Sequence, residues 1–270
     1  MATLNTPRIP IAMKTTTSKM QSTVKSASRA LELLAHFDQV RRPLPLNQIV
    51  AALGYPVSSA AVLLRSLVTL GYLHHDRAAR TYMPSLKVAR LASWVGDYFL
   101  EGDADIAALV ARLQDKSGET IIVAVRNSLH VQYVHVASSR EALQFVPQIG
   151  AMRPLWQTPT GWCLMSRLLD KEIESLVKRS IAEFGTQSGL DIASVKASIE
   201  QVRKAGFAYS ANRFHQGVGI IAAPLPRQVR GMNVAIGIGG PTSRLDRNEA
   251  SIGALLRTEI SAWDRRRRVR

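Results

Sequence analysis

The sequence contains a single cysteine, Cys163, among its 270 residues. One cysteine cannot form an intrachain disulfide or a thiolate metal cluster, which excludes a disulfide-stapled secreted scaffold and favours a reducing, cytoplasmic setting. The sequence also lacks any run of about 18 apolar residues, the length that a membrane-spanning helix needs. Its hydrophobic fraction of 46% and charged fraction of 20% are ordinary for a globular protein, and its length favours two domains.

Acidic residues are scarce in the first third of the chain. Residues 1–95 contain 12 Lys and Arg but 3 Asp and Glu, whereas residues 96–264 contain 18 and 17, and the last six residues include five arginines. Such segregation predicts that the front of the chain meets a polyanion. Nucleic acid is favoured over a membrane because no basic amphipathic helix with a Trp or Phe face occurs there. Residues 1–23 are expected to form a disordered basic arm, and residues 264–270 a solvated basic tail.

Three segments between residues 26 and 70 have apolar residues at helical spacing. In the first, Ser26 is the expected N-cap, and one apolar stripe contains Ala27, Ala30, Leu31, Leu34 and Phe37. The second covers residues 46–53 and ends at Gly54. The third is expected to start at a cap on Ser58 or Ser59 and to run to Leu70, with a buried face of Ala60, Leu63, Leu64 and Leu67. Two short helices joined by a Gly-containing turn are typical of a helix-turn-helix.

The rest of the chain alternates between strand and helix patterns. Residues 72–75 and 81–83 flank a polar turn and predict a hairpin, and residues 86–102 predict a linker helix. Further helices are expected near 106–116, 161–169, 170–184, 192–205 and 246–263. Strands are expected at 120–125, 130–136, 217–224 and 233–239. Interleaved helices and hairpin strands indicate an α+β domain.

Four ordered segments carry a resemblance to a known family. Residues 54–73 read GYPVSSAAVLLRSLVTLGYL, and the later segments are GAMRPLWQTPTG at 150–161, GVGIIAAP at 217–224 and VAIGIGGP at 234–241. With SRALELL at 28–34 ahead of them, the chain resembles the IclR family of bacterial transcriptional regulators over roughly residues 24–263.

The resemblance implies a fold and a mode of action. It implies an N-terminal winged helix-turn-helix at residues 24–85, joined by the linker helix at 86–102 to a GAF-like effector-binding domain at 103–263 with a central antiparallel sheet. It also implies a homodimer or homotetramer that binds a palindromic DNA operator and is switched by a small organic acid. No cofactor, metal or catalytic residue is expected.

The DNA-reading residues follow from the geometry of the motif, because the second helix of a helix-turn-helix lies in the major groove. Its outward positions would be Val57, Ser58, Ser59, Ala61, Val62, Arg65 and Ser66. Arg77 and Arg80 in the wing are candidates for phosphate or minor-groove contact, and Lys25, Arg29, Arg41 and Arg42 for backbone-positioning charges.

The recognition helix departs from the family pattern. Val57, Ala61 and Val62 stand where relatives usually have a Lys and a His-Arg pair, so the outward face is unusually apolar. One interpretation is readout through thymine methyl groups and DNA shape, with affinity supplied by the flanking basic residues. The alternative is a small-molecule-binding or catalytic protein that has lost sequence-specific DNA readout.

Carrying over the family's ligand-lining positions gives the candidate effector-binding residues Arg153, Pro159, Thr160, Ser210, Val218, Ile220, Gly237 and Gly239. Gly237 and Gly239 replace serines of other members, which removes hydroxyl donors and is expected to open room for a bulkier, flatter ligand. The effector hypothesis is therefore an aromatic or medium-sized organic acid, with Arg153 or Arg213 as the partner of its carboxylate. Trp156 is either a stacking ring for the ligand or a residue of an interface or of the core.

Other functional classes find little support. Residues 217–222 fit a GxGxxA pattern but lie in an expected strand rather than between a strand and a helix, as a dinucleotide site requires. The six histidines include no HxxxH pair, and Cys163 is expected in the core. A protein-interaction module, whose basic ends bind an acidic partner, remains a third class.

Overall fold

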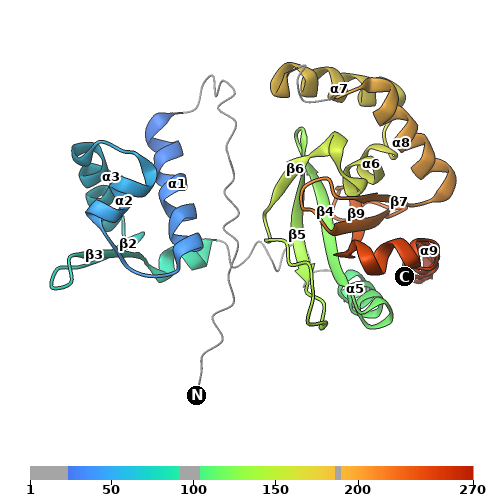
Figure 1. The fold of residues 1–270 in the computed structure, drawn as a ribbon, viewed down its shortest axis with the longest axis horizontal. Helices are drawn as coiled ribbons and strands as arrows, with labels where there is room; N and C mark the ends of the chain where they lie inside the picture. Colours follow the sequence, from blue (N-terminus) through green and yellow to red (C-terminus); the bar gives the residue numbers. More distant parts are fainter. Residues whose placement is uncertain (1–23, 92–103, 186–189, 270) are drawn as a thin grey trace. The chain divides into compact units, whose positions relative to one another are not determined.

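The computed structural model describes residues 24–91, 104–185 and 190–269 (Figure 1). The chain divides into two compact units between Ala89 and Arg90. The expected basic arm at 1–23 and most of the expected linker helix at 86–102 lie outside the described residues, although residues 86–91 are helical.

The N-terminal unit is a three-helix domain with a small sheet. Its helices are α1 (Lys25–Val40), α2 (Leu46–Leu53) and α3 (Val57–Thr69). Its strands are β1 (Leu44–Pro45), β2 (Leu73–Asp76) and β3 (Thr81–Pro84), paired antiparallel in the order β1-β3-β2. The β2–β3 hairpin is the expected wing. The core includes Leu33, Phe37, Ile49 and Leu64, so that all three helices contribute to it.

Three details of these helices differ from the sequence-based expectation. Leu33 is buried and Leu31 is 68% exposed, so the stripe predicted through Leu31 was wrong. Val24, not Ser26, is the N-cap residue of α1, and it makes no side-chain cap hydrogen bond. Helix α3 begins at Val57 after Pro56, so the caps expected at Ser58 or Ser59 were also wrong.

The C-terminal unit is built on a six-stranded antiparallel sheet in the order β6-β5-β4-β9-β8-β7. The inner strands are β4 (Thr120–Asn127), β5 (His130–Ala137), β8 (Val218–Pro224) and β9 (Val234–Pro241). The edge strands β6 (Met152–Pro154) and β7 (Ala208–Ala211) were not predicted from the sequence. The arrangement confirms the expected α+β domain with a central antiparallel sheet.

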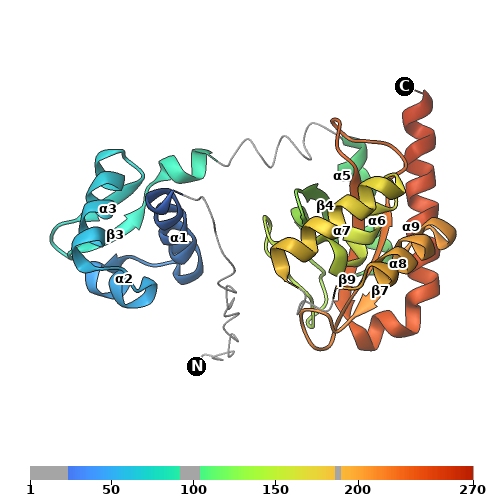
Figure 2. The same cartoon turned by 90° about the horizontal axis from the view of Figure 1, so that it is seen from above.

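Helices cover both faces of this sheet. One face packs against α6 (Pro159–Met165), α7 (Asp170–Phe184) and α8 (Ile192–Ala205), preceded by a 3-10 turn at Leu155–Gln157. The other face packs against α5 (Ala104–Ser117) and α9 (Thr242–Val269) (Figure 2). Because strand side chains alternate between faces, Ile122 and Ile220 belong to the first layer and Ile121 and Ile221 to the second.

The expected solvated tail is instead the end of α9. Asp264 is 9% exposed, and its carboxylate accepts a hydrogen bond of 2.6 Å from Arg227 Nε. The guanidinium of Arg267 lies 5.0 Å from the ring centroid of Trp263. The prediction of a solvated segment was therefore wrong at Asp264, because its charge is paired within the fold.

None of the described helices is by itself long and apolar enough to cross a membrane. Helices α2 and α3 reach that length and apolar content only when taken together, and the chain bends by 117° between them.

Candidate DNA-reading surface and effector pocket

Helix α3 separates an apolar core face from an exposed face. Ala60, Leu64 and Leu67 are buried against the other helices, which confirms three of the four core positions predicted for it. On the opposite side, Val57 and Val62 are 60% and 53% exposed. Ser58, Arg65 and Ser66 are also exposed, while Ser59 and Ala61 are half-buried. The predicted outward residues thus share one face, and its most apolar members are open to a partner.

The turn before α3 holds this helix against α1. Gly54 has a φ of 65°, a left-handed conformation that glycine adopts without strain, and the 117° bend is in the range of helix-turn-helix motifs. Next to it, Tyr55 is 8% exposed and its hydroxyl donates to the carboxylate of Glu32 on α1. Burial, followed by this contact with a negative charge, raises the pKa of Tyr55. The guanidinium of Arg29 lies 4.9 Å from the centre of the Tyr55 ring.

The predicted backbone-positioning cations therefore have different local roles. Arg29 packs on Tyr55, and Arg41 ends α1 with a φ of 51° while its guanidinium lies 3.6 Å from the Asp38 carboxylate. Arg42 Nη1 donates to the backbone oxygen of Pro43. Lys25 is exposed at the first turn of α1.

The wing is closed by an acidic turn residue. The Asp76 carboxylate accepts hydrogen bonds from the backbone N–H groups of Ala79 and Ala78, and these hold the pKa of Asp76 below its usual value. Arg77 and Arg80 are exposed on either side of that turn, where Arg80 has a φ of 53°. Both predicted wing cations therefore lie at the tip of the hairpin.

A pocket lies on the face of the large sheet that packs against α6, α7 and α8, and the β5–β6 and β7–β8 loops border it. It is lined from strand β6 by Arg153, from the start of α6 by Pro159, and from β7 and β8 by Ser210, Val218 and Ile220. These are five of the eight predicted effector-binding positions. Its free volume is about 30 Å³, which is room for about one water molecule.

Two arginines border this pocket, and neither forms a salt bridge with a carboxylate among the described residues. Arg153 donates from Nη1 to the backbone oxygen of Met152, and its guanidinium lies 5.4 Å from the ring centroid of Phe214. Arg213, also considered from the sequence, is exposed and lies 3.4 Å from Ser210 Oγ through Nε. Each guanidinium therefore keeps donors for an anion.

Three of the predicted positions do not line the pocket: Thr160, Gly237 and Gly239. Thr160 is completely buried and its hydroxyl lies 3.3 Å from Thr158 Oγ1. A side chain at Gly237 would meet Thr160 at 3.2 Å, and one at Gly239 would meet the Phe145 ring at 2.9 Å. In this structure neighbouring side chains fill the space at both glycines, so the room for a bulkier ligand that they were expected to open stays a prediction.

The sequence reading missed the aromatic part of the pocket. Tyr133, Phe145, Phe214 and His215 all line it. Burial raises the pKa of Tyr133, against the opposing effect of the Arg153 charge. Alternation along β5 gave a signal for Tyr133 alone, because Phe145 lies in the long loop between β5 and β6, and Phe214 and His215 in the loop between β7 and β8.

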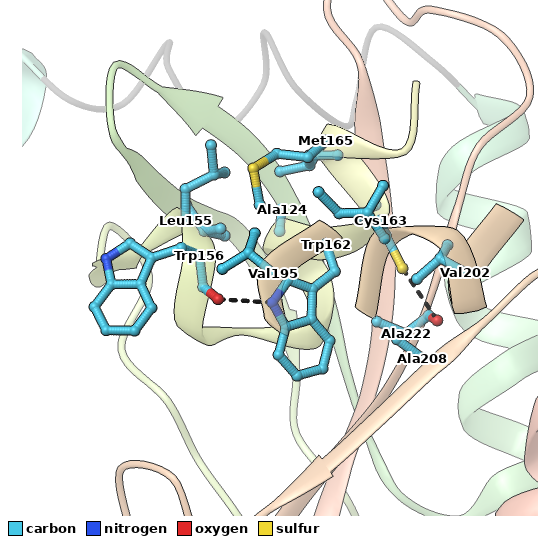
Figure 3. Close-up of a cluster of buried hydrophobic side chains, with 14 of the residues drawn as sticks. Ala124, Leu155, Trp156, Trp162, Cys163, Met165, Val195, Val202, Ala208 and Ala222 are labelled. Carbon is cyan, nitrogen blue, oxygen red and sulfur yellow. Dashed lines mark hydrogen bonds between the residues drawn. The ribbon is translucent and has the colours of Figure 1, made fainter. Parts of the chain in front are cut away.

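The expected core cysteine is confirmed, and Trp156 is also a core residue. Cys163 is fully buried, its thiol donates to the Ala222 carbonyl at 3.2 Å, and burial raises its pKa (Figure 3). Trp162 Nε1 donates to the Trp156 carbonyl at 2.7 Å, which ties α6 to the preceding 3-10 turn (Figure 3). Within the described ranges, no three His, Cys, Asp or Glu side chains are grouped to hold a metal ion.

Comparison with known proteins gives a consistent result for both units. A model of the IclR helix-turn-helix domain matches residues 26–77, and one of the bacterial transcriptional regulator IclR C-terminal domain matches residues 104–264. The HTH-type transcriptional repressor AllR of Escherichia coli K12 is 23% identical over 243 residues, which cover 88% of each chain. The glycerol operon regulatory protein of Streptomyces coelicolor is 27% identical over 235 residues, 84% of this chain and 89% of that protein.

A solved structure has a similar fold over most of the chain. The IclR structure of Thermotoga maritima superposes with a TM-score of 0.69 over 89% of this chain and 98% of that one, at 16% identity. At this identity the likeness concerns the fold alone.

Proposed function

The chain belongs to the IclR family of bacterial transcriptional regulators, and we propose that its effector is an organic acid with an aromatic or similarly flat apolar body. The family membership makes it a ligand-responsive, DNA-binding transcriptional regulator. The observation that carries the proposal about the effector is a pocket with aromatic walls and two arginines without carboxylate partners among the described residues.

The pocket chemistry favours such an acid over a neutral or cationic ligand. A guanidinium offers a planar pair of N–H donors that matches a carboxylate, and such charge-assisted hydrogen bonds are the stronger kind. Arg153 and Arg213 supply that chemistry, whereas Tyr133 and Phe214 supply aromatic walls for an apolar body. A two-carbon acid would leave these rings without contact, so the class extends to ring-sized acids.

For DNA recognition we propose that α3 reads thymine methyl groups and DNA shape. Val57 and Val62 are exposed apolar side chains, which lose contact with water when a groove covers them. Arg65 is the exposed cation on the same face, suited to guanine or phosphate. The basic residues of α1 and of the wing would add affinity that depends on salt rather than on sequence.

We further propose a homodimer or homotetramer acting in the cytoplasm on a palindromic operator. Two-fold symmetric recognition helices need half-sites about one helical turn apart, or a multiple of it. An effector that binds one arrangement of the sensing domains better than another shifts the population of arrangements, and so changes the spacing of the recognition helices.

The test is a gel shift with the full chain on the DNA upstream of its own gene, against random DNA at moderate salt. We expect a discrete shift that random competitor does not remove. Val62→Ala is expected to weaken that complex about fivefold, because it withdraws apolar area from the interface, and to leave random-DNA binding unchanged. Leu70→Ala is the matched control: it is 57% exposed but lies at the C-terminal end of α3.

Equal binding to both DNAs would contradict sequence-specific readout and favour the alternative of a sensor without it. The effector arm uses isothermal titration of aromatic and short aliphatic acids. Tight binding restricted to two- or three-carbon acids would contradict the proposed effector class. Loss of binding in Arg153→Met or Arg213→Met would identify the carboxylate partner.

A further inference from the structure

We propose that Phe145 is a plug of the effector pocket that the ligand must displace, and that the bare backbone at Gly239 is the seat of its ring. This inference rests on the proposed function, since it concerns ligand entry at the same pocket. Phe145 would then determine which sizes of ligand the regulator accepts.

The first observation is the mismatch between the pocket lining and its free volume. The lining includes the side chains of Tyr133, Phe145 and Phe214, yet the free volume of about 30 Å³ holds one water rather than a ring. A benzene-sized ligand needs a cavity several times larger, on the order of 150 Å³. At least one lining side chain must therefore leave before a ring-sized acid enters.

The second observation identifies the side chain that occupies the space. The Phe145 ring is so close to Gly239 that an added Cβ there would lie 2.9 Å from Phe145 Cδ1 and 3.4 Å from Cε1. On the pocket side, the ring centroid of Phe145 lies 6.1 Å from that of His215. The ring therefore fills the gap between strand β9 and the loop that carries Arg213.

The third observation is that the backbone of Phe145 is fixed while its side chain is only half-buried. Thr120 Oγ1 donates to the Phe145 carbonyl at 2.6 Å, and Arg244 Nη2 donates to the Leu143 carbonyl at 2.9 Å. Arg244 is itself held by a bidentate pair with the buried Glu119 carboxylate. With the backbone anchored at these two points, rotation about the side-chain torsions of Phe145 is the direct way to empty its seat.

The neighbouring residues of the loop do not share this position. Leu143 and Val146 are 66% and 55% exposed, so they neither line the pocket nor belong to the core. Phe145 and Ala151 are the residues of this loop that pack against the core cluster of the α6–α8 layer, and of the two Phe145 lines the pocket. The loop therefore presents one ring to the pocket, and its removal changes the pocket without removing a core element.

The experiment compares the full-length wild type, Phe145→Ala and the control Leu143→Ala, which shortens an exposed side chain of the same loop. The probes are 1-naphthoate and its neutral counterpart 1-naphthylmethanol, titrated by isothermal calorimetry. If the closed arrangement accounts for about nine-tenths of the molecules, its removal tightens binding about tenfold. We expect that gain in Phe145→Ala for both probes, and wild-type affinity in Leu143→Ala.

The two probes separate the plug from the proposed function. A gain for both probes without preference for naphthoate would support the plug and contradict the arginine-bound acid. Unchanged or weaker binding of both probes in Phe145→Ala, or an equal gain in Leu143→Ala, would overturn the plug.

A second pair of variants tests the seat itself. Gly239→Ala places a methyl group where the ring lies, and is expected to displace the ring and raise the affinity for benzoate. Gly237→Ala, on the same face of the same strand, meets Thr160 and Ile220 instead of Phe145 and is the matched control. Equal effects of the two substitutions would contradict a seat at Gly239.

Discussion

Replacing Gly161 with alanine should destabilise the C-terminal unit, because the start of α6 packs directly on backbone. A Cβ at Gly161 would lie 1.8 Å from the backbone oxygen of Leu155 and 2.8 Å from Thr158 Oγ1. Normal carbon–oxygen contacts are about 3.3 Å or longer, so the helix and the 3-10 turn would have to separate by roughly 1.5 Å. No side-chain rotation relieves a contact with a carbonyl oxygen.

The size of the effect follows from this geometry. Overpacking a core costs about 1–3 kcal/mol, and a clash with backbone belongs at the upper end. For a domain of this size each kcal/mol lowers Tm by about 2–4 °C, so the expected fall is about 6–12 °C. The separation would also stretch the 2.7 Å hydrogen bond from Trp162 Nε1 to the Trp156 carbonyl.

Scanning calorimetry of the full chain is the appropriate assay, because two units can unfold in separate transitions. Gly253→Ala is the matched control: it is also a helical glycine of the C-terminal unit, but its Cβ would meet the Phe207 ring at 2.6 Å, and a side chain can move. A Tm of Gly161→Ala within about 2 °C of wild type, or a larger fall in Tm for Gly253→Ala, would contradict a clash with the backbone at Gly161.

Three further predictions concern pH and stability. Burial lowers the pKa of His135. The stability that this neutral imidazole contributes is therefore present above about pH 6.5 and is lost as pH falls through the lower folded pKa. In thermal melts, the fall in Tm from pH 7.5 to pH 5.5 should be smaller in His135→Gln than in wild type. Hydrogen bonds from Lys116 and Arg112 lower the pKa of Glu259. Glu259→Gln should therefore lower the free energy of unfolding in urea by about 1–3 kcal/mol at neutral pH, and this difference from wild type should shrink below pH 4.5. Tyr55→Phe removes the hydroxyl that binds the Glu32 carboxylate and should lower the midpoint of the N-terminal transition while leaving the C-terminal one unchanged; equal midpoints would contradict its role in holding α1 to the turn before α3.

Local patterns predicted the long elements well. Helix α2 ends at Leu53 before Gly54, and α8 ends at Ala205 before Gly206, which has a φ of 79°. Both glycines adopt the left-handed conformation that few other residues take without strain, so the sequence marks these boundaries. Helix α1 shows the limit of periodicity. Leu31, Leu33 and Leu34 allow two stripes at helical spacing, and only the positions of α2 and α3 decide that Leu33 faces the core.

The short strands were missed for a related reason. Strands β6 and β7 contain three and four residues, too few to show an alternation that stands out from a loop. Their pairing with β5 and β8 comes from neighbours already in the sheet. Because Arg153 lies on β6 and Ser210 on β7, the sequence indicated the pocket residues through family resemblance rather than through predicted structure.

The glycines of β9 show why a binding pocket is harder to predict than a helix. From the sequence, Gly239 in place of a larger residue indicated empty space, since a missing side chain leaves volume behind. Whether that volume stays empty depends on the residues that face it, and these come from a distant loop: the Phe145 ring reaches the seat because Thr120 and Arg244 hold the loop backbone. A core packed at the density of organic crystals fills such gaps, so a glycine on the wall predicts a close neighbour at least as well as a larger ligand. If the gap at Gly239 serves a ligand, Phe145→Ala should bind ring-sized ligands more tightly than wild type. If the gap serves only to seat the Phe145 ring, the affinity should not rise.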